Sequence, residues 1–227
     1  EGGLVVDLGC GTGASTRRLA ARFPQASSFL GIDLSPYFIA VGQKLLEQAP
    51  GASEPWVTAV QSDPRVELRF GDASSTQLPD GCASVVNLCL VIHELPPEAS
   101  RAVCAEALRI LKPGGQLWIS EMDFRAPAYA ELRANALLFS LIRATEPYLD
   151  QYADSSEALF QHLASGIGFE SIRIAAATGR HFALVATKDA NGGDDRGVMD
   201  DRRFDEGGNY AVEDTHLKTW ESKSSDA

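Results

Sequence analysis

The sequence is poor in cysteine, has fewer basic than acidic residues and contains no long apolar run. Its 227 residues include 20 Lys and Arg against 31 Asp and Glu, which gives a formal net charge of −11. This balance argues against a general nucleic-acid-binding surface, because contacts to phosphate groups depend on clustered cations. No apolar run approaches the roughly 20 residues that span a bilayer, and no signal peptide is recognisable. We therefore expect a soluble protein with no nucleic-acid partner and no membrane span.

The cysteines do not fit a zinc site or a disulfide framework. Cys10, Cys82, Cys89 and Cys104 show no CxxC spacing, and three of them lie in segments with a buried pattern. We interpret them as reduced core thiols in a reducing compartment, such as the cytoplasm or a plastid stroma. No metal site is predicted.

A glycine-rich stretch near the start of the chain is the most informative local pattern. Residues 4–8 form a short, apolar, β-branched run, and glycines follow at positions 9, 11 and 13 before a helical pattern begins. Such a run predicts a buried parallel strand that leads into a tight turn. Glycines let the backbone approach a ligand closely, and the amide groups at the following helix start favour a partly anionic ligand. The stretch therefore predicts a nucleotide-cofactor loop.

Strand and helix patterns alternate along the rest of the chain. This alternation predicts an α/β fold with a doubly wound, mostly parallel, seven-stranded Rossmann-like sheet. The last two strands are joined by only a few residues, so they are predicted to form an antiparallel hairpin. The expected strands are 4–8, 28–33, 66–70, 83–92, 116–120, 169–176 and 181–188, and the expected helices are 15–23, 36–49, 97–111, 127–144 and 155–166.

The composition predicts one folded domain and a tail. With 44% hydrophobic residues, the chain can bury one good core, which we place in residues 1–189. Residues 190–227 contain clusters of Gly and Asp with few apolar residues, and they are predicted to be a disordered acidic tail.

Acidic residues fall at the carboxyl ends of the predicted strands, where open parallel sheets bind ligands. Asp33 follows Gly13 by 20 positions, a spacing at which a carboxylate reaches a ribose diol. Asp7 lies beside the glycine turn and suits a ligand with an ammonium group better than a pyrophosphate. Asp72 offers an acceptor for an exocyclic adenine amine. Together these positions indicate an adenosine cofactor that carries an amino acid.

Four motifs resemble those of class I S-adenosylmethionine-dependent methyltransferases. They are residues 5–16, 31–35, 70–73 and 111–115, and the resemblance covers most of residues 1–188. Within that superfamily the chain is most similar to small-molecule methyltransferases typified by the ubiquinone and menaquinone pathway enzymes. The resemblance implies S-adenosyl-L-methionine as cofactor and methyl transfer to a small organic acceptor by in-line displacement. A helical segment usually precedes the first strand of such enzymes, so with Glu1 as first residue we expect a fragment that lacks it.

The resemblance also implies roles for individual residues around the cofactor. Asp7, Gly9 and Gly11 are expected at the methionine part, with Cys10 and Gly13 in the same loop. The remaining expected contacts are Asp33 with the ribose hydroxyls, Leu34 and Ala73 with the adenine faces, Asp72 with the adenine amine, and Asn87 and Leu88 along the methionine side.

The candidate catalytic residues are His93 and Glu94, which follow the fourth strand. A base is needed only if the acceptor must lose a proton, and His93 could instead be a packed loop residue. Glu121 and Asp123 are interpreted as capping or loop residues. Polar groups in the helices expected to cover the acceptor either contact substrate or end a helix: Glu146, Tyr148, Asp150 and Tyr152.

Two alternatives stay open at this point. A protein with this fold could bind the cofactor without turnover and act as a scaffold. The spacing Gly9-x-Gly11-x-x-Ala14 also satisfies the dinucleotide fingerprint, which leaves a nicotinamide-dependent oxidoreductase as a more distant alternative.

Overall fold

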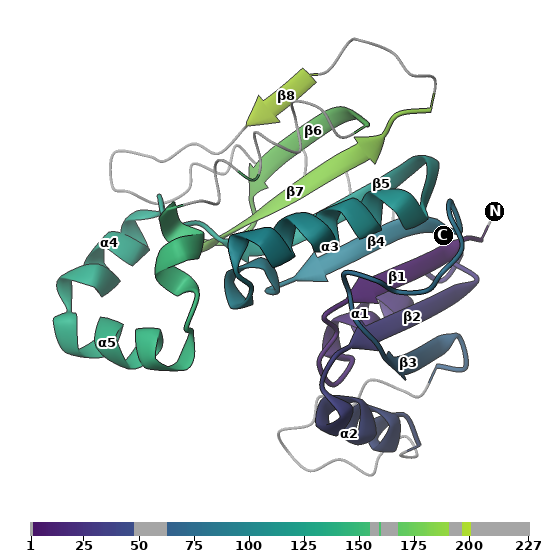
Figure 1. Ribbon diagram of the computed structural model, residues 1–227, viewed down its shortest axis with the longest axis horizontal. Coiled ribbons are helices and arrows are strands. Elements are labelled where there is room, and N and C mark those ends of the chain that lie inside the picture. Colours follow the sequence, from purple (N-terminus) through teal and green to yellow (C-terminus); the bar gives the residue numbers. More distant parts are fainter. Residues whose placement is uncertain (1, 48–62, 155–158, 160–167, 191–196, 201–227) are drawn as a thin grey trace, which may run out of the picture.

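One eight-stranded sheet organises the chain (Figure 1). The computed structural model describes residues 2–47, 63–154, 159, 168–190 and 197–200. The strand order is β3-β2-β1-β4-β5-β7-β6-β8, in which β1 to β5 pair in parallel, β7 is antiparallel to β5 and β6, and β8 is parallel to β6. The strands are β1 (Leu4–Leu8), β2 (Ser28–Asp33), β3 (Val66–Phe70), β4 (Ala83–Cys89), β5 (Leu111–Met122), β6 (Phe169–Ala176), β7 (His181–Lys188) and β8 (Gly197–Asp200).

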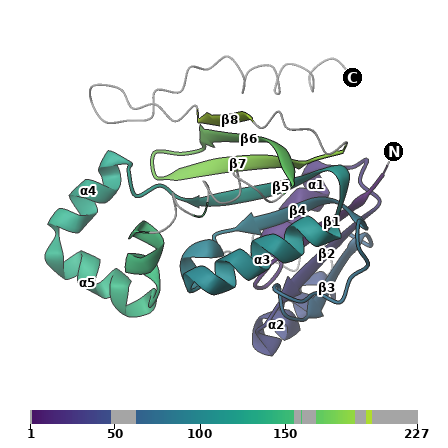
Figure 2. The same cartoon turned by 45° about the horizontal axis from the view of Figure 1, so that its top comes forward.

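Helices cover both faces of the parallel half of this sheet (Figures 1 and 2). In β1, Val6 faces the main core beneath α3, and its neighbour Val5 packs with Phe29 and Ala20 on the side of α1. Because both of its faces are buried, β1 is almost continuously apolar. The helices are α1 (Ala14–Arg22), α2 (Pro36–Glu47), the 3₁₀ turn η1 (Ile92–Glu94), α3 (Pro97–Ile110), α4 (Pro127–Ala134) and α5 (Ala136–Thr145).

The predicted α/β fold class is confirmed, including the antiparallel hairpin of β6 and β7. Three details differ from prediction. The fourth strand ends at Cys89 and not at Ile92, because Leu90 adopts a left-handed φ of 58° that turns the backbone into η1. The helix predicted over 127–144 is two helices, because Asn135 has non-helical dihedrals and its side chain accepts the Leu138 N–H. The fifth strand begins at Leu111, five residues earlier than expected.

A fourth difference from prediction concerns the C-terminal part of the chain. The four residues of β8 lie within the segment predicted to be a disordered tail, and they add an eighth strand to the seven that were expected. A four-residue strand is too short to stand out in a composition averaged over 190–227. The helix predicted at 155–166 lies outside the described residues except for position 159, which is helical.

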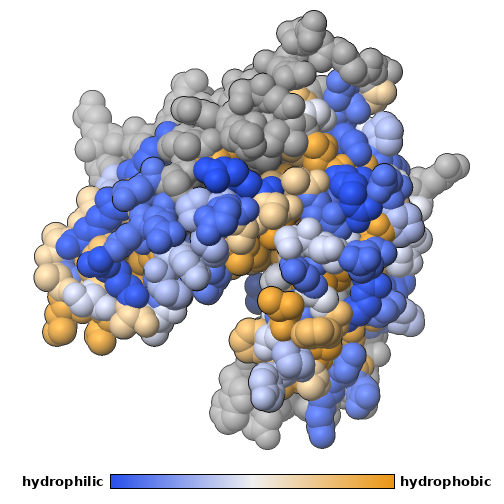
Figure 3. All heavy atoms as spheres, viewed as in Figure 1, coloured by the Kyte–Doolittle hydropathy of each residue, from blue (hydrophilic) through white to orange (hydrophobic). Residues whose placement is uncertain are grey.

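The carboxyl ends of β1, β2 and β4 point toward the side of the molecule where α4 and α5 lie (Figure 1). On this face the surface is hollowed between the part formed by α4 and α5 and the part formed around α2 (Figure 3). The topology therefore brings the predicted site residues to one edge of the sheet. Within the described residues, no helix combines the length and the apolar composition needed to cross a bilayer.

Candidate active site

The glycine turn after β1 has the strained geometry that its sequence predicts. Gly9, Gly11 and Gly13 have φ values of 70°, 55° and 77°, which side-chain-bearing residues rarely adopt. A Cβ on Gly13 would lie 2.7 Å from a Leu68 methyl carbon, so that glycine is also required by packing. At Gly11 nothing lies within 4 Å of the same position. Gly11 therefore presents bare backbone to open space, where a ligand can approach it.

Asp33 is fixed beside this bare backbone. Its Oδ2 accepts the Gly11 N–H at 2.8 Å, and its Oδ1 accepts the Ser35 N–H at 2.8 Å. A carboxylate has about four lone-pair sites, so two further hydrogen bonds can be accepted from a diol. The next residue, Leu34, is 64% exposed and offers an apolar surface beside the carboxylate.

Asp7 is held by three side chains from neighbouring elements. Ser15 and Thr16, at the start of α1, donate to Oδ2 at 2.6 Å each, and Asn87 in β4 donates to Oδ1 at 2.7 Å. Burial raises the pKa of Asp7, although these three hydrogen bonds oppose the rise. With 1% of its surface exposed, Asp7 joins β1, α1 and β4 beneath the turn. Its expected contact with a methionine ammonium group stays a prediction.

The other expected cofactor residues differ in their access to a ligand. Asp72 is exposed, and its Oδ1 accepts the backbone N–H and the hydroxyl of Ser74 at 2.7 Å each. Ala73 is half-buried against the main core. Leu88 is completely buried in that core, so its expected contact along the methionine side stays a prediction. Cys10 is also buried, and burial is the main cause that raises its pKa to about 12.

His93 forms a buried pair with Glu121. The two oxygens of Glu121 lie 2.9 and 2.8 Å from His93 Nδ1, and Oε2 also accepts the His93 backbone N–H at 3.2 Å. Burial lowers the pKa of His93, but the hydrogen bond and charge of Glu121, with the charges of Glu94 and Glu146, raise it overall. Burial raises the pKa of Glu121 itself. The pair therefore fixes the imidazole at the carboxyl ends of β4 and β5.

Two more carboxylates meet the other ring nitrogen of His93. Nε2 lies 3.8 Å from Glu94 Oε1 and 3.8 Å from Glu146 Oε2. Burial, followed by the charge of Glu146, raises the pKa of Glu94. Glu146 Oε2 is buried and has no hydrogen-bond partner among the described residues. The structure thus brings together His93, Glu94 and Glu146, three of the predicted site residues.

Sequence reasoning missed two features of this arrangement. It interpreted Glu121 as a capping or loop residue, although the end of β5 lies next to the end of β4 and so next to His93. It also gave no role to Ser15 and Thr16, whose hydroxyls hold Asp7. In both cases, the position of these residues at the carboxyl edge of the sheet was the sequence signal that could have identified them.

Two of the other polar residues predicted near the acceptor, Tyr152 and Asp150, contact other parts of the protein. The Tyr152 hydroxyl donates to the Met122 carbonyl at 2.6 Å, and the Tyr152 ring packs edge-on against His93. Asp150 is exposed and pairs with Arg143. Tyr152 therefore supports the His93 ring, whereas a substrate contact by Asp150 or Tyr148 stays a prediction.

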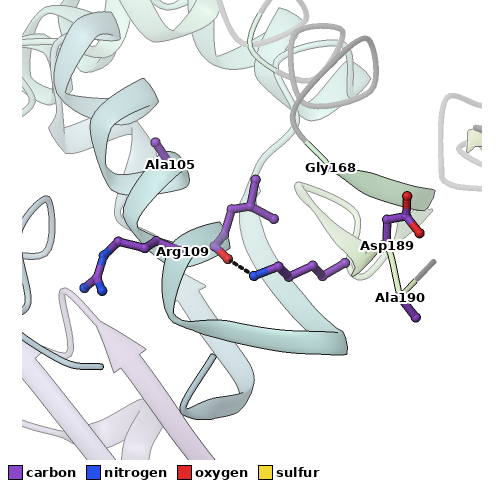
Figure 4. Close-up of a pocket in the computed structure, with 7 residues that line it drawn as sticks. Ala105, Arg109, Gly168, Asp189 and Ala190 are labelled. Carbon is purple, nitrogen blue, oxygen red and sulfur yellow. Dashed lines mark hydrogen bonds between the residues drawn. The ribbon is translucent and has the colours of Figure 1, made fainter. Parts of the chain in front are cut away.

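A separate hollow of about 450 Å³ lies at the opposite edge of the sheet (Figure 4). It is lined by residues near the end of α3 and the end of β7, including Ala105, Arg109 and Asp189. Lys188 spans it by donating to the Leu108 carbonyl at 2.8 Å. Because ligands of parallel sheets bind at the carboxyl ends of the strands, this hollow is not the candidate active site.

Comparison with known proteins identifies the family of this fold. A family model described as a methyltransferase domain matches residues 5–115. The chain is 36% identical over 122 residues to a carboxy-S-adenosyl-L-methionine synthase of Chromohalobacter salexigens, covering 53% of this chain and 40% of that protein. It is 24% identical over 186 residues to the ubiquinone/menaquinone biosynthesis C-methyltransferase UbiE of Geotalea uraniireducens, covering 76% and 73%.

A solved structure supports the same fold. The SAM-dependent methyltransferase structure from Methanosarcina mazei aligns with a TM-score of 0.58 at 19% identity, covering 84% of this chain and 94% of that one. The chain spans less than half the length of several curated relatives to which it is 30 to 40% identical. The family match over residues 5–115, the curated relatives and the shared sheet topology make this chain similar to the class I S-adenosylmethionine-dependent methyltransferases, whose cofactor is S-adenosyl-L-methionine.

Proposed function

We propose that this domain transfers the methyl group of S-adenosyl-L-methionine to a small organic acceptor by in-line displacement. The observation that carries the proposal is the pairing of Gly11 with Asp33. Gly11 leaves its backbone open to a ligand, and Asp33 is hydrogen-bonded to that same backbone with acceptor capacity to spare. This arrangement suits a ribose that lies across the glycine turn.

The residues around this pair fit the rest of the cofactor. The exposed side chain of Leu34 and the half-buried Ala73 supply apolar surface for an adenine, and the exposed Asp72 supplies an acceptor for its amine. The Asp7 network holds the glycine turn and the start of α1 together, which orients the amide groups for the methionine end. These residues support the proposed adenine and ribose contacts, and the methionine end rests on the amide groups of the glycine turn.

The chemistry asks little of the protein beyond positioning. The sulfonium already activates the methyl carbon, so alignment of the acceptor and exclusion of water supply much of the rate acceleration. His93 and Glu94 are the proposed catalytic residues, because they lie at the end of β4 beside the turn that follows β1. Glu121 is the proposed positioning residue, since it fixes the His93 ring through Nδ1.

A small organic acceptor is supported by the surroundings of this cluster. The surface is hollowed beside α4 and α5 (Figure 3). Helix α5 has no buried residue and exposes Leu137, Leu138 and Leu141, which supply apolar surface near the candidate site. The UbiE relative is named for methylation at carbon in quinone biosynthesis, which is compatible with an acceptor of mixed polar and apolar character.

The first experiment measures cofactor binding by the protein. Isothermal calorimetry with S-adenosylhomocysteine is expected to show one site per chain, and calorimetry with NAD is expected to show none. Binding of NAD without binding of S-adenosylhomocysteine would overturn the proposal in favour of an oxidoreductase.

The second experiment measures turnover. A metabolite extract incubated with methyl-labelled cofactor is expected to yield a labelled small molecule. Cofactor binding without any labelled product would instead favour a protein that binds the cofactor without turnover. In the active case, an H93A variant is expected to lose most of its activity, whereas full activity would remove His93 from the catalytic residues.

A further inference from the structure

We propose that His93, Glu94 and Glu146 bind one divalent transition-metal ion at the acceptor end of the site. Nothing in the family comparison assigns a metal to these residues, and the sequence alone predicted none. The binding itself is independent of methyl transfer. Its use in positioning an acceptor rests on the function proposed above.

The distances between the three side chains suit a common ion. His93 Nε2 lies 3.8 Å from an oxygen of Glu94 and 3.8 Å from an oxygen of Glu146, and the three ligand atoms lie within 4.8 Å of one another. Two ligands that each lie about 2.1 Å from the same ion are at most about 4.2 Å apart. Small rotations of the Glu94 and Glu146 side chains therefore suffice to bring all three ligand atoms within bonding distance of one ion.

The histidine is already held in the orientation of a metal ligand. Its Nδ1 lies 2.8 and 2.9 Å from the two oxygens of Glu121, so in the neutral imidazole that a metal binds, Nδ1 would carry the proton and the Nε2 lone pair would face Glu94 and Glu146. A carboxylate that orients a histidine through its other ring nitrogen is the usual support of a metal-binding imidazole. Glu121 is completely buried, and the hydrogen bonds of its carboxylate found in the described part of the chain all involve His93.

Two atoms aimed into the cluster lack hydrogen-bond partners. The His93 side chain is 92% buried, and no hydrogen bond to its Nε2 is found in the described part of the chain. Glu146 Oε2 is also buried and unpartnered there. Buried polar atoms normally find a partner, because an unsatisfied one costs about 1–3 kcal/mol. An ion between Nε2 and the glutamates would satisfy both atoms at once.

The charges favour the same occupant. Glu94 and Glu146 approach one another beside Glu121, so three carboxylates meet one imidazole, and burial with the Glu146 charge raises the pKa of Glu94. A single proton on His93 balances only part of this charge. A divalent cation balances more of it, and its oxygen and imidazole ligands favour ions such as Mn²⁺, Fe²⁺ or Zn²⁺ over Mg²⁺ or Ca²⁺.

Three protein ligands leave coordination positions open for an acceptor oxygen. The Glu94 side chain is half exposed, so the cluster can be reached from solvent. With the ion present, Nε2 is a ligand and does not exchange a proton directly with the acceptor. His93 and Glu94 would then serve the acceptor by holding the ion that positions it.

Calorimetry of the metal-free, full-length protein with Mn²⁺ alone tests the site. Mn²⁺ is chosen because the four thiols of the chain prefer softer ions. One Mn²⁺ per chain is expected, and the variants E94Q and E146Q are each expected to weaken binding by at least about tenfold. The control E131Q removes an exposed glutamate on α4 and is expected to leave the affinity within about twofold. No Mn²⁺ binding, or equal binding by all three variants, would overturn the proposal.

A second measurement separates the ion from a shared proton. In NMR titrations the ring signals of His93 are expected to titrate in the metal-free protein and to stop titrating when Zn²⁺ is added. His181, the first residue of β7, lies beside the Thr178 hydroxyl and is expected to titrate in both samples. If His93 titrates unchanged with Zn²⁺ present, the cluster holds protons and not a metal.

The metal site and the methyltransfer function fail in different assays. S-adenosylhomocysteine binding is expected to be the same with and without chelator, because Asp33 and Gly11 take no part in the cluster. Loss of Mn²⁺ binding with cofactor binding intact would refute only the metal site. Mn²⁺ binding without any cofactor binding would refute only the proposed function.

Discussion

The two ends of the candidate active site satisfy their carboxylates in different ways. At the cofactor end, both oxygens of Asp7 accept short hydrogen bonds from Ser15, Thr16 and Asn87. At the acceptor end, Glu94 and Glu146 face His93 at 3.8 Å without a hydrogen bond to its Nε2. The Asp7 network at the cofactor end is complete without a ligand, whereas the acceptor end has polar groups left to satisfy.

This difference indicates how the two ends work. A closed hydrogen-bond network holds the glycine turn in one geometry, so little ordering is needed when the cofactor binds. Close, partly buried carboxylates are costly by themselves, so the acceptor end gains stability when a cation or a proton arrives. The cofactor end should therefore respond to mutation through stability and the acceptor end through charge.

The largest effect is expected at Asp7. In D7A the donors of Ser15, Thr16 and Asn87 lose their common acceptor in a buried place, and each unsatisfied group costs about 1–3 kcal/mol. Because hydroxyl groups can rotate to other acceptors, we expect a total loss of about 2–4 kcal/mol in the free energy of unfolding. Urea denaturation followed by circular dichroism measures it.

The matched control is D80A. Asp80 is an aspartate that pairs with Arg109, but its side chain is 82% exposed. Surface substitutions of this kind usually change stability by no more than about 0.5 kcal/mol. Equal losses in D7A and D80A would mean that the cofactor end is not the closed network described above.

The second effect concerns cofactor affinity and is expected at Asp33. D33N keeps one acceptor oxygen but removes the charge, and hydrogen bonds to charged groups contribute about 1.5–3 kcal/mol. We expect the dissociation constant of S-adenosylhomocysteine to rise by about 10- to 100-fold, measured by calorimetry. D72N, at an exposed aspartate, is expected to cause a smaller rise, and D80N none. An unchanged affinity in D33N would remove the ribose assignment.

The third effect tests the charges of the acceptor end through pH. His93 has a raised pKa, so its protonation stabilises the fold fully below about pH 6.5 and this stability is lost as pH rises through the folded-state pKa. E121Q removes the main group that raises this pKa, while burial continues to lower it. We expect the His93 pKa to fall and the loss of unfolding free energy between about pH 6 and pH 8 to shrink.

The measurement is an NMR titration of the His93 ring, paired with urea denaturation at the two pH values. His181 is a second reporter, because burial, Arg180 and the charge of His93 lower its pKa and Glu121 is not among the causes. A His93 pKa that stays the same in E121Q would show that Glu121 does not control the imidazole.

Most of the cofactor end could be predicted from the sequence. The bounds of β1 and β2 follow from apolar runs and those of β3 from an alternating run, each ending at or just before Gly or Asp. The parallel topology then brings Asp7, Asp33 and Asp72 to one edge. Leu88 shows the limit of this reasoning. Its position in β4 suggested a contact with the cofactor, but side chains alternate between the two faces of a strand, and Leu88 faces the core.

The acceptor end was harder to predict because its residues come from distant parts of the sequence. His93 was identified from its place after β4, but its partner Glu121 lies 28 positions away and Glu146 more than 50. No local sequence pattern predicts which carboxylates lie next to His93, because that depends on the path of the chain through α4 and α5. Glu146 was one of four polar residues predicted near the acceptor, and among them it is the one whose carboxylate lies beside His93 Nε2.

The smallest effect is expected at Asn135, which sets that path. Asn135 separates α4 from α5, and its Oδ1 accepts the Leu138 N–H at 3.1 Å as the N-cap of α5. Replacement of an N-cap asparagine by alanine costs about 1 kcal/mol, and alanine also favours one continuous helix of the kind that the apolar pattern predicts. In N135A we expect faster amide hydrogen exchange in α5 and unchanged S-adenosylhomocysteine affinity.

Because Glu146 follows α5 directly, the Mn²⁺ affinity of N135A should also fall by a few-fold. N135D, which retains a capping oxygen, should restore both the slow exchange and the Mn²⁺ affinity, whereas altered cofactor affinity in N135A would show that the two ends are not independent.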